Sequence, residues 1–144
     1  MKFFCFCYYE SERFKAMSES DLEAVGRACK PHDEALRESG HLLLVGSLGE
    51  PESARTIWAK SDGYNVMDGP YAETREPIGA FFIIEAKDMN EAVEVASKHP
   101  GAQLGQYFGG GIEIRPIDQY FVFPAPSLVA PAPSLVAPAK AGDQ

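Results

Sequence analysis

The chain has 144 residues, of which 45% are hydrophobic and 24% are charged. This length and composition predict one soluble globular domain with enough apolar side chains to build a core. The formal net charge is −8, and an acidic surface repels the phosphates of nucleic acids and of anionic membranes. We therefore expect neither nucleic acid nor a membrane among its partners.

The chain opens with a continuous run of apolar and aromatic side chains over residues 2–9. Such a run predicts a strand that is buried on both faces, and it is too short to span a bilayer. Acidic residues follow the run, without a small-residue cleavage pattern. We therefore expect a cytoplasmic protein.

The three cysteines are Cys5, Cys7 and Cys29. An odd number without a CxxC pair predicts neither a disulfide framework nor a zinc site. The histidines and carboxylates also lack the spacing of a metal centre, and we expect no cofactor. The thiols are interpreted as small apolar side chains of the core.

A helix is predicted after residue 18. Ser18 or Ser20 offers an N-cap, with an acidic residue three positions further on to complete a capping box. Pro31 interrupts the helical pattern, so that we expect a kink or two short helices around it. Gly40 is a typical residue just beyond a helix end.

The remaining elements define the fold class. In chain order the pattern predicts a strand over 42–48, a hairpin of strands 54–60 and 64–67, a strand over 79–85, a helix over 89–98 ended by His99-Pro100-Gly101, and a strand over 111–115. This order predicts an α+β, ferredoxin-like βαββαβ fold with an inserted β-hairpin. Helices would cover one face of an antiparallel sheet. The bare face would then pack against the sheet of a second copy in a homodimer.

Beyond residue 120 the composition changes. The segment Pro-Ala-Pro-Ser-Leu-Val-Ala at 124–130 is repeated without change at 131–137. Such a proline-rich segment favours extended conformations without a helix or a sheet ladder. We expect a domain over 1–120 and a tail over 121–144, which is either mobile or docked on a neighbouring subunit through its leucines and valines.

The most informative stretch joins two predicted strands at 68–78. Asp68-Gly69-Pro70 is typical of a tight turn, because Asp caps its own turn, Gly accepts a positive φ and Pro fixes the next φ. Glu73 and the following charged residues place two acids and a base close together. A carboxylate beside a guanidinium stays ionised, whereas one buried beside another carboxylate titrates closer to neutrality.

Residues 68–76 resemble the signature Asp-Gly-Pro-Phe-x-Glu-Thr-Lys-Glu of the YCII-related, DGPF-motif family. Tyr71 stands for phenylalanine and Arg75 for lysine, which keeps the aromatic bulk and the positive charge. The Glu-Ile-Arg-Pro-Ile ending at 113–117 matches as well, so that the resemblance covers about residues 1–120. It implies a dimeric ferredoxin-like fold, the α+β barrel also used by muconolactone isomerases and small cofactor-free monooxygenases. It implies no particular substrate.

In the YCII branch of this family, a helix histidine and an aspartate are suggested as an acid–base pair. The register of that histidine falls near Cys29 here, and His32 lies three residues later on an adjoining face of the helix. A histidine at this place would exchange a proton near pH 7. The residues that we predict for the site are His32, Asp68, Glu73 and Glu76 for catalysis, with Arg75 and Tyr71 for substrate binding.

Two functions of different classes fit these residues. The first is a cofactor-independent acid–base enzyme acting on a small organic substrate, with Arg75 holding an anionic group. The second is a non-catalytic small-molecule-binding or regulatory dimer linked to transcriptional control, since relatives in the resembled family are often encoded near alternative sigma factors. In the second case Asp68 only caps its turn, and the charges at 73–76 form a surface ion-pair cluster.

Overall fold

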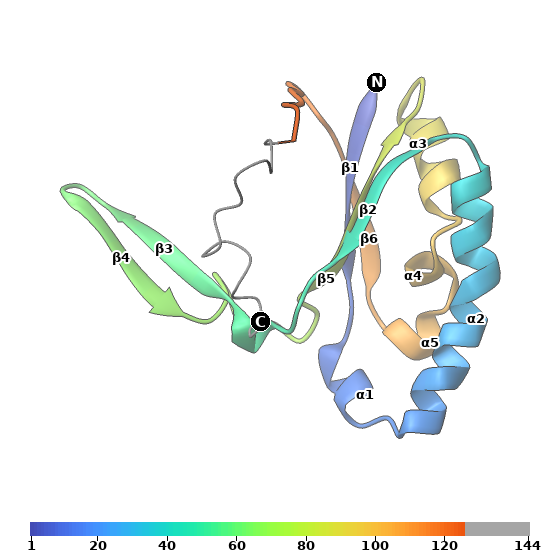
Figure 1. Cartoon of the computed structure of the whole chain (residues 1–144), viewed down its shortest axis with the longest axis horizontal. Helices are drawn as coiled ribbons and strands as arrows, with labels where there is room; N and C mark the ends of the chain where they lie inside the picture. The colour runs from blue at the N-terminus through green and yellow to red at the C-terminus, as the bar shows by residue number, and fades with distance from the viewer. Residues whose placement is uncertain (126–144) are drawn as a thin grey trace.

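The computed structural model of the chain describes residues 1–125 (Figure 1). Its helices and strands follow one another as β1 (Lys2–Tyr8), α1 (Ser11–Lys15), α2 (Glu19–Glu38), β2 (Leu42–Ser47), the short 3-10 helix η1 (Pro51–Ser53), β3 (Arg55–Lys60), β4 (Gly63–Asp68), β5 (Ile78–Glu85), α3 (Met89–Ala96), α4 (Pro100–Gln103), α5 (Gly105–Phe108) and β6 (Gly111–Pro116). The repeated proline-rich segments and the predicted mobility or docking of the tail lie outside the described residues, except for the first two residues of the repeat.

The main sheet has the strand order β2-β5-β1-β6, and each neighbouring pair is antiparallel. Counted in chain order, these four strands are arranged 2-3-1-4, which is the ferredoxin-like arrangement of two split βαβ units. Among residues 1–125, strands β3 and β4 pair only with each other, in a separate two-stranded sheet. The predicted ferredoxin-like α+β fold with an inserted hairpin is thus confirmed.

The central strand β1 divides its side chains between the two faces of the sheet. Phe3, Cys5 and Cys7 are buried against the helices, as expected for side chains that alternate along a strand. Phe4 and Phe6 point to the opposite face and are half-buried. The prediction that both faces of this strand are buried is therefore confirmed for the helix-covered face, whereas the opposite face is only half-buried.

The helix-covered face holds the main core of the protein. Its buried residues are Phe3, Cys5, Cys7, Leu36, Ala80, Phe82, Ile84, Ala86, Ala92, Val95 and Ala96. Figure 1 shows α2 to α5 gathered on this one side of the sheet. Burial raises the pKa of the Cys5 thiol to about 12, so that this cysteine stays a neutral, apolar core side chain as predicted.

Helix α2 begins with the predicted capping box. The Ser18 side chain accepts a hydrogen bond from the backbone N–H of Asp21, and the Asp21 carboxylate accepts one from the backbone N–H of Ser18. Pro31 lies inside the helix, which continues as one element to Glu38. The alternative of two short helices is therefore wrong. The Pro31 side chain is exposed. Val25, before the proline, and Leu36, after it, are buried, and their packing holds both halves of α2 against the rest of the protein.

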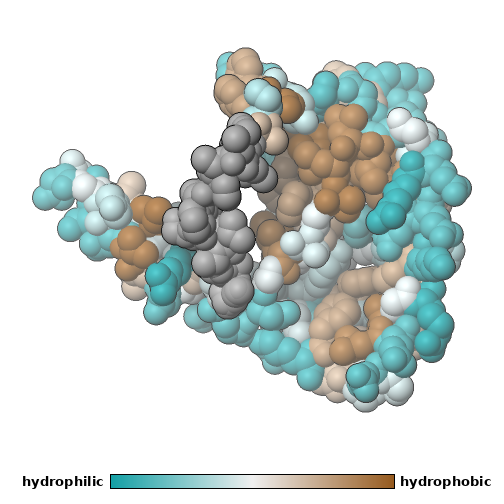
Figure 2. All heavy atoms as spheres, in the orientation of Figure 1, coloured by the Kyte–Doolittle hydropathy of each residue, from teal (hydrophilic) through white to brown (hydrophobic). Residues whose placement is uncertain are grey.

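Opposite the helices, the main sheet has an open face that no other element of the described chain covers. By register its aromatic centre is formed by Phe4, Phe6 and Phe81, with ring centroids 4.6 Å apart for Phe4–Phe6 and 5.9 Å for Phe4–Phe81. Gly46 leaves room for the Phe81 ring, since a Cβ there would come within 2.5 Å of its tip. Apolar atoms also gather over the outer strand β2 (Figure 2), where Leu43, Leu44 and Val45 are exposed.

The paired strands β3 and β4 form an arm, residues 55–68, that projects away from the sheet (Figure 1). Every residue of β4 is exposed. The apolar side chains on the arm include Ile57, Val66 and Met67, which are 69%, 54% and 56% exposed. A lone two-stranded ribbon is only marginally stable in water, so the arm depends on whatever packs against it.

Among the helices of the described residues, none is long and apolar enough to cross a membrane.

We predict that Gly110→Ala destabilises the protein by about 3 kcal/mol, because the added Cβ would fall on the backbone carbonyl oxygen of Tyr8, in the central strand. Gly111→Ala, one residue later, meets no atom within 4 Å and serves as the matched control. Urea unfolding followed by circular dichroism measures both. Equal midpoints for the two variants would show that the 109–111 segment yields easily.

Candidate functional site

The motif turn is attached to the base of the arm. Gly69 has a φ of +102°, a conformation that only glycine adopts without strain. Its N–H donates to the carbonyl of Ala54 over 2.8 Å, and its own carbonyl accepts from the Thr56 hydroxyl over 2.8 Å. The Asp68 carboxylate pairs across the arm with the Arg55 guanidinium, Oδ1 to Nε at 3.2 Å. The positive-φ turn is thus confirmed, and the interaction that Asp68 makes is with Arg55.

The other end of the motif loop is attached to the main body. The Arg75 guanidinium donates to the Glu10 carboxylate, Nη2 to Oε2 at 2.5 Å, and Arg13 holds the other oxygen at 2.9 Å. Arg75 lowers the pKa of Glu10, whose carboxylate therefore stays ionised. The Tyr9 N–H also donates to the carbonyl of Pro77 over 3.1 Å. Residues 69–77 are thus a loop fastened at both ends.

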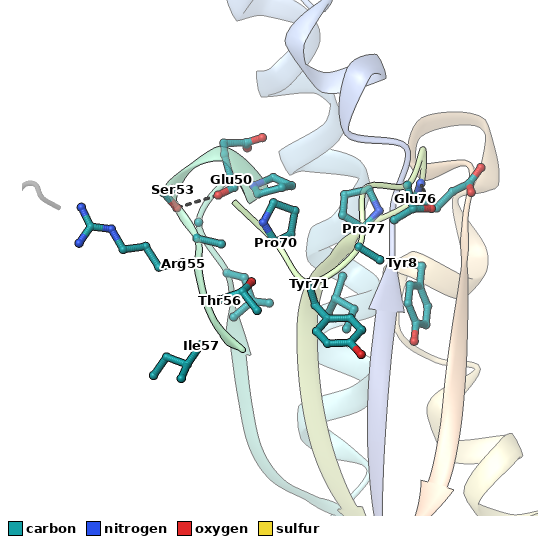
Figure 3. Close-up of a pocket in the computed structure, with 17 residues that line it drawn as sticks. Tyr8, Glu50, Ser53, Arg55, Thr56, Ile57, Pro70, Tyr71, Glu76 and Pro77 are labelled. Carbon is teal, nitrogen blue, oxygen red and sulfur yellow. Dashed lines mark hydrogen bonds between the residues drawn. The ribbon is translucent and has the colours of Figure 1, made fainter. Parts of the chain in front are cut away.

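Between this loop, the segment 48–54 and the base of the arm lies a cleft of about 710 Å³ (Figure 3). Most of its lining side chains are apolar or aromatic, and they include Tyr8, Leu48, Pro51, Ile57, Pro70, Tyr71, Pro77 and Ile78. Two smaller hollows, of about 240 and 470 Å³, share Pro51 and Pro77 with it. The three hollows therefore adjoin one another around these two prolines.

Two tyrosines from distant parts of the chain come together at the cleft (Figure 3). The Tyr8 hydroxyl donates to Glu113 Oε1 over 2.7 Å, which raises the pKa of Tyr8 and keeps it a phenol. Its oxygen lone pairs remain able to accept from a ligand. The Tyr71 ring stacks on Trp58 with centroids 4.5 Å apart, and its side chain is well exposed. The cleft therefore offers two aromatic surfaces with fixed positions.

The structure brings together most of the residues predicted from the motif. Tyr71 and Glu76 line the main cleft, and Asp68 and Glu73 line the adjoining 470 Å³ hollow. Arg75 turns the other way, toward Glu10.

His32 lies on α2 and lines none of the three hollows. The motif residues thus share one site that His32 does not reach in a single copy of the chain. The catalytic and binding roles of all six residues stay predictions.

Sequence reasoning missed Arg55, which lines the cleft and directs its guanidinium outward (Figure 3). It belongs to a strand whose pattern predicted only a hairpin, and its partner Asp68 is thirteen residues away. Glu10 was also missed. Its partner Arg75 lies 65 positions away in the sequence, so no local pattern links the two residues. Pairing of the hairpin in register was the signal that would have placed Arg55 opposite Asp68.

A second polar cluster is buried beneath the helices. The His99 ring stacks on Phe82 with centroids 4.8 Å apart and an interplanar angle of 5°. Its Nδ1 accepts from the Gly101 N–H over 2.9 Å, so that the other ring nitrogen carries the hydrogen and faces the Cys7 Sγ at 4.0 Å. Burial lowers the pKa of His99 to about 4 and raises that of Cys7 to about 11. Both groups are therefore neutral near pH 7.

Helix α2 brings further polar groups to the edge of this cluster. Burial raises the pKa of Asp33; burial is also the main cause that raises the pKa of Tyr9, followed by Cys7, Cys29 and Asp33. Asp33 follows Cys29 by one helical turn, on the stripe that carries Val25. The sequence signal that could have revealed this cluster is the Asp33 carboxylate on an otherwise apolar stripe of the helix. Among the described residues, no group of three or more histidine, cysteine, aspartate or glutamate side chains is arranged to hold a metal ion.

The model of the YCII-related domain matches residues 1–118, and the chain therefore belongs to the YCII-related family. A protein of Rhizobium meliloti (strain 1021) named uncharacterized protein R00369 is 30% identical over 121 residues, which are 84% of this chain and 95% of the relative. A solved structure of 5-chloro-2-hydroxyhydroquinone dehydrochlorinase (TftG) from Burkholderia phenoliruptrix AC1100, in complex with 2,5-dihydroxybenzoquinone, has a TM-score of 0.44 and 15% identity, covering 83% of this chain and 96% of that chain. The fold assigned above rests on the strand order of this chain itself.

We predict that the free energy of unfolding decreases as the pH is lowered from about 6.5 to about 4, because of His99. The unfolded chain binds a proton below about pH 6.5, whereas the buried ring resists it until about pH 4, so acidification favours the unfolded state. The loss through this group is on the order of 3 kcal/mol and is complete below pH 4. His99→Asn keeps an acceptor for Gly101 and removes the titration, so the pH dependence of its urea midpoint should be flatter than that of the parent. Parallel profiles would contradict the assignment.

Proposed function

We propose that the chain is a small-molecule-binding protein of the YCII-related family and that the cleft beneath the motif loop is its binding site. The observation that carries this proposal is the loop itself. The residues that match the family signature are fastened at both ends and wall a cleft of about 710 Å³, within the usual size range of ligand pockets. A fastened loop supports binding because little ordering is left for the ligand to impose.

The lining indicates the chemistry of the ligand. Proline, isoleucine and leucine side chains suit an apolar body, and the rings of Tyr8 and Tyr71 suit a flat one. Arg55 lines the same cleft with its guanidinium pointing outward, away from Tyr8 and Tyr71 (Figure 3); Asp68 occupies its Nε, and after a turn of the side chain toward the cleft its terminal nitrogens would form a fork for a carboxylate or a phenolate. The favoured ligand is a compact, flat organic molecule with one anionic group. Arg55 takes over the role that the sequence alone suggested for Arg75.

The same proposal includes a homodimer through the open sheet face. Phe4, Phe6 and Phe81 form an aromatic surface that water solvates poorly. The charges that share this face by register are Lys2 with Glu85, and Glu113 with Arg115, two of each sign. Two copies with a net charge of −8 repel each other least where their surfaces are neutral. A second copy is therefore the partner that fits this face.

Two outcomes of binding remain open. Glu76 is half-buried among the residues that line the cleft, and an acid–base step by its carboxylate on the ligand would make the protein a cofactor-independent enzyme. The side chain of Asp68 is 90% exposed and His32 lies elsewhere, which favours binding without turnover in a regulatory dimer, with transcriptional control as the process predicted from the family.

A thermal-shift screen against small carboxylates, lactones and phenols tests the proposal. A ligand at about 100 times its Kd stabilises the folded state by about 2.7 kcal/mol, which raises the melting temperature by several degrees. We expect the rise to disappear in Tyr71→Ala and Arg55→Met and to persist in His32→Ala. Both cleft substitutions are at exposed positions, so the unliganded variants should melt close to the parent.

The same panel separates the two outcomes. In an enzyme, Glu76→Gln keeps the thermal shift but abolishes consumption of the ligand, as followed by chromatography. In a regulatory dimer no ligand is consumed by the parent either. A shift that survives both Tyr71→Ala and Arg55→Met would place the ligand elsewhere and overturn the proposal.

A further inference from the structure

The arm and the open face of the sheet diverge from the base of the arm (Figure 1), and we call the region between them the wedge. The cleft lies at the base of the arm, where the two meet (Figure 3). The sheet contributes Tyr8 to the cleft, and the arm contributes Arg55 and Ile57. The cleft is therefore walled on two sides by surfaces that diverge as they leave it. On its wide side it has no wall from the described residues of the same copy.

The arm carries apolar side chains that no part of its own described chain covers. Ile57 and Val66 are directly paired across the two strands, and Tyr64 lies on the same face, at 67% exposed. The cross-strand pairs are the whole attachment between the two strands, apart from the turn. Because a two-stranded ribbon is marginal in water, this arm needs a partner that is present whenever the protein folds. A second copy of the chain is such a partner, because it is present wherever the protein dimerises.

We propose that a second copy fills the wedge, so that the arm of each copy clasps the other and the partner supplies the missing wall of the cleft. This inference rests on the proposed dimer and on the proposed cleft, and it goes beyond both by making the site a product of two chains. In a two-fold arrangement the same contact occurs twice, which suits a chain that presents an open face and an arm side by side. The open face is neutral in an otherwise acidic protein.

The first experiment places a photoreactive p-benzoylphenylalanine at position 57, in the cleft wall of the full-length protein. Protein labelled with 15N is mixed with unlabelled protein before irradiation, and cross-linked peptides are identified by mass spectrometry. We expect mixed-isotope cross-links from position 57 to a peptide of the other copy. Cross-links confined to one copy, including any to residues 126–144, would overturn the inference because the chain would then cover its own cleft.

The second experiment removes the apolar pair without removing the arm. The double variant Ile57→Lys with Val66→Glu places opposite charges directly across the two strands, which favours their pairing. Ile57→Val with Val66→Ile keeps the surface apolar and is the matched control. We expect the charged variant to sediment as a monomer, with at least tenfold faster amide exchange over residues 55–68 and unchanged exchange in β1. The control should remain a dimer.

The outcomes distinguish this inference from the proposed function. A charged variant that stays a dimer with a protected arm would overturn the clasp, and so would a monomeric parent. Neither experiment uses a ligand, so a thermal-shift screen without a hit leaves the clasp standing. Conversely, a cleft that binds ligand equally well in the monomeric charged variant would leave the proposed function standing and overturn the role of the partner as its wall.

Discussion

The pairing of β1 with both β5 and β6 is the constraint on which the rest of the molecule depends. Because side chains alternate along a strand, this register sends Phe3, Cys5 and Cys7 to the helices and Phe4 and Phe6 to the open face. A slip by one residue would exchange the two sets. The strand ends at Tyr8, and Tyr8 and the next two residues, Tyr9 and Glu10, contact the cleft, the buried polar cluster and the motif loop respectively. The position of the site follows from the position of this strand.

Local patterns were sufficient to predict the fold. The capping box at Ser18 and the order of apolar runs are features of neighbouring residues, and the structure contains both of them. Pro31 was misleading because its local cost is met by distant packing along α2. The short helices α1, α4 and α5 were not predicted, since five- and four-residue helices carry too few residues for a helical period.

The candidate site was predictable only in part. The motif identified Tyr71 and Glu76, because matching residues of a family lie at matching places. Tyr8, Arg55 and Glu10 come from three other elements, and their meeting depends on how the arm leaves the sheet. His32 illustrates the converse, since it sits near the expected helix register and yet lines none of the hollows. Spacing along the chain places a residue on an element but does not place the element over a cleft.

The turn at Gly69 connects the arm to the wall of the cleft. The Thr56 and Ala54 contacts with Gly69 lie at the base of the arm, beside the cleft wall. From there the six-residue strands extend roughly 20 Å. A tilt about this base that moves the wall slightly moves the tip several times further. A change of shape in the cleft that tilted the arm would therefore alter the position of the arm tip on the outer surface of the molecule.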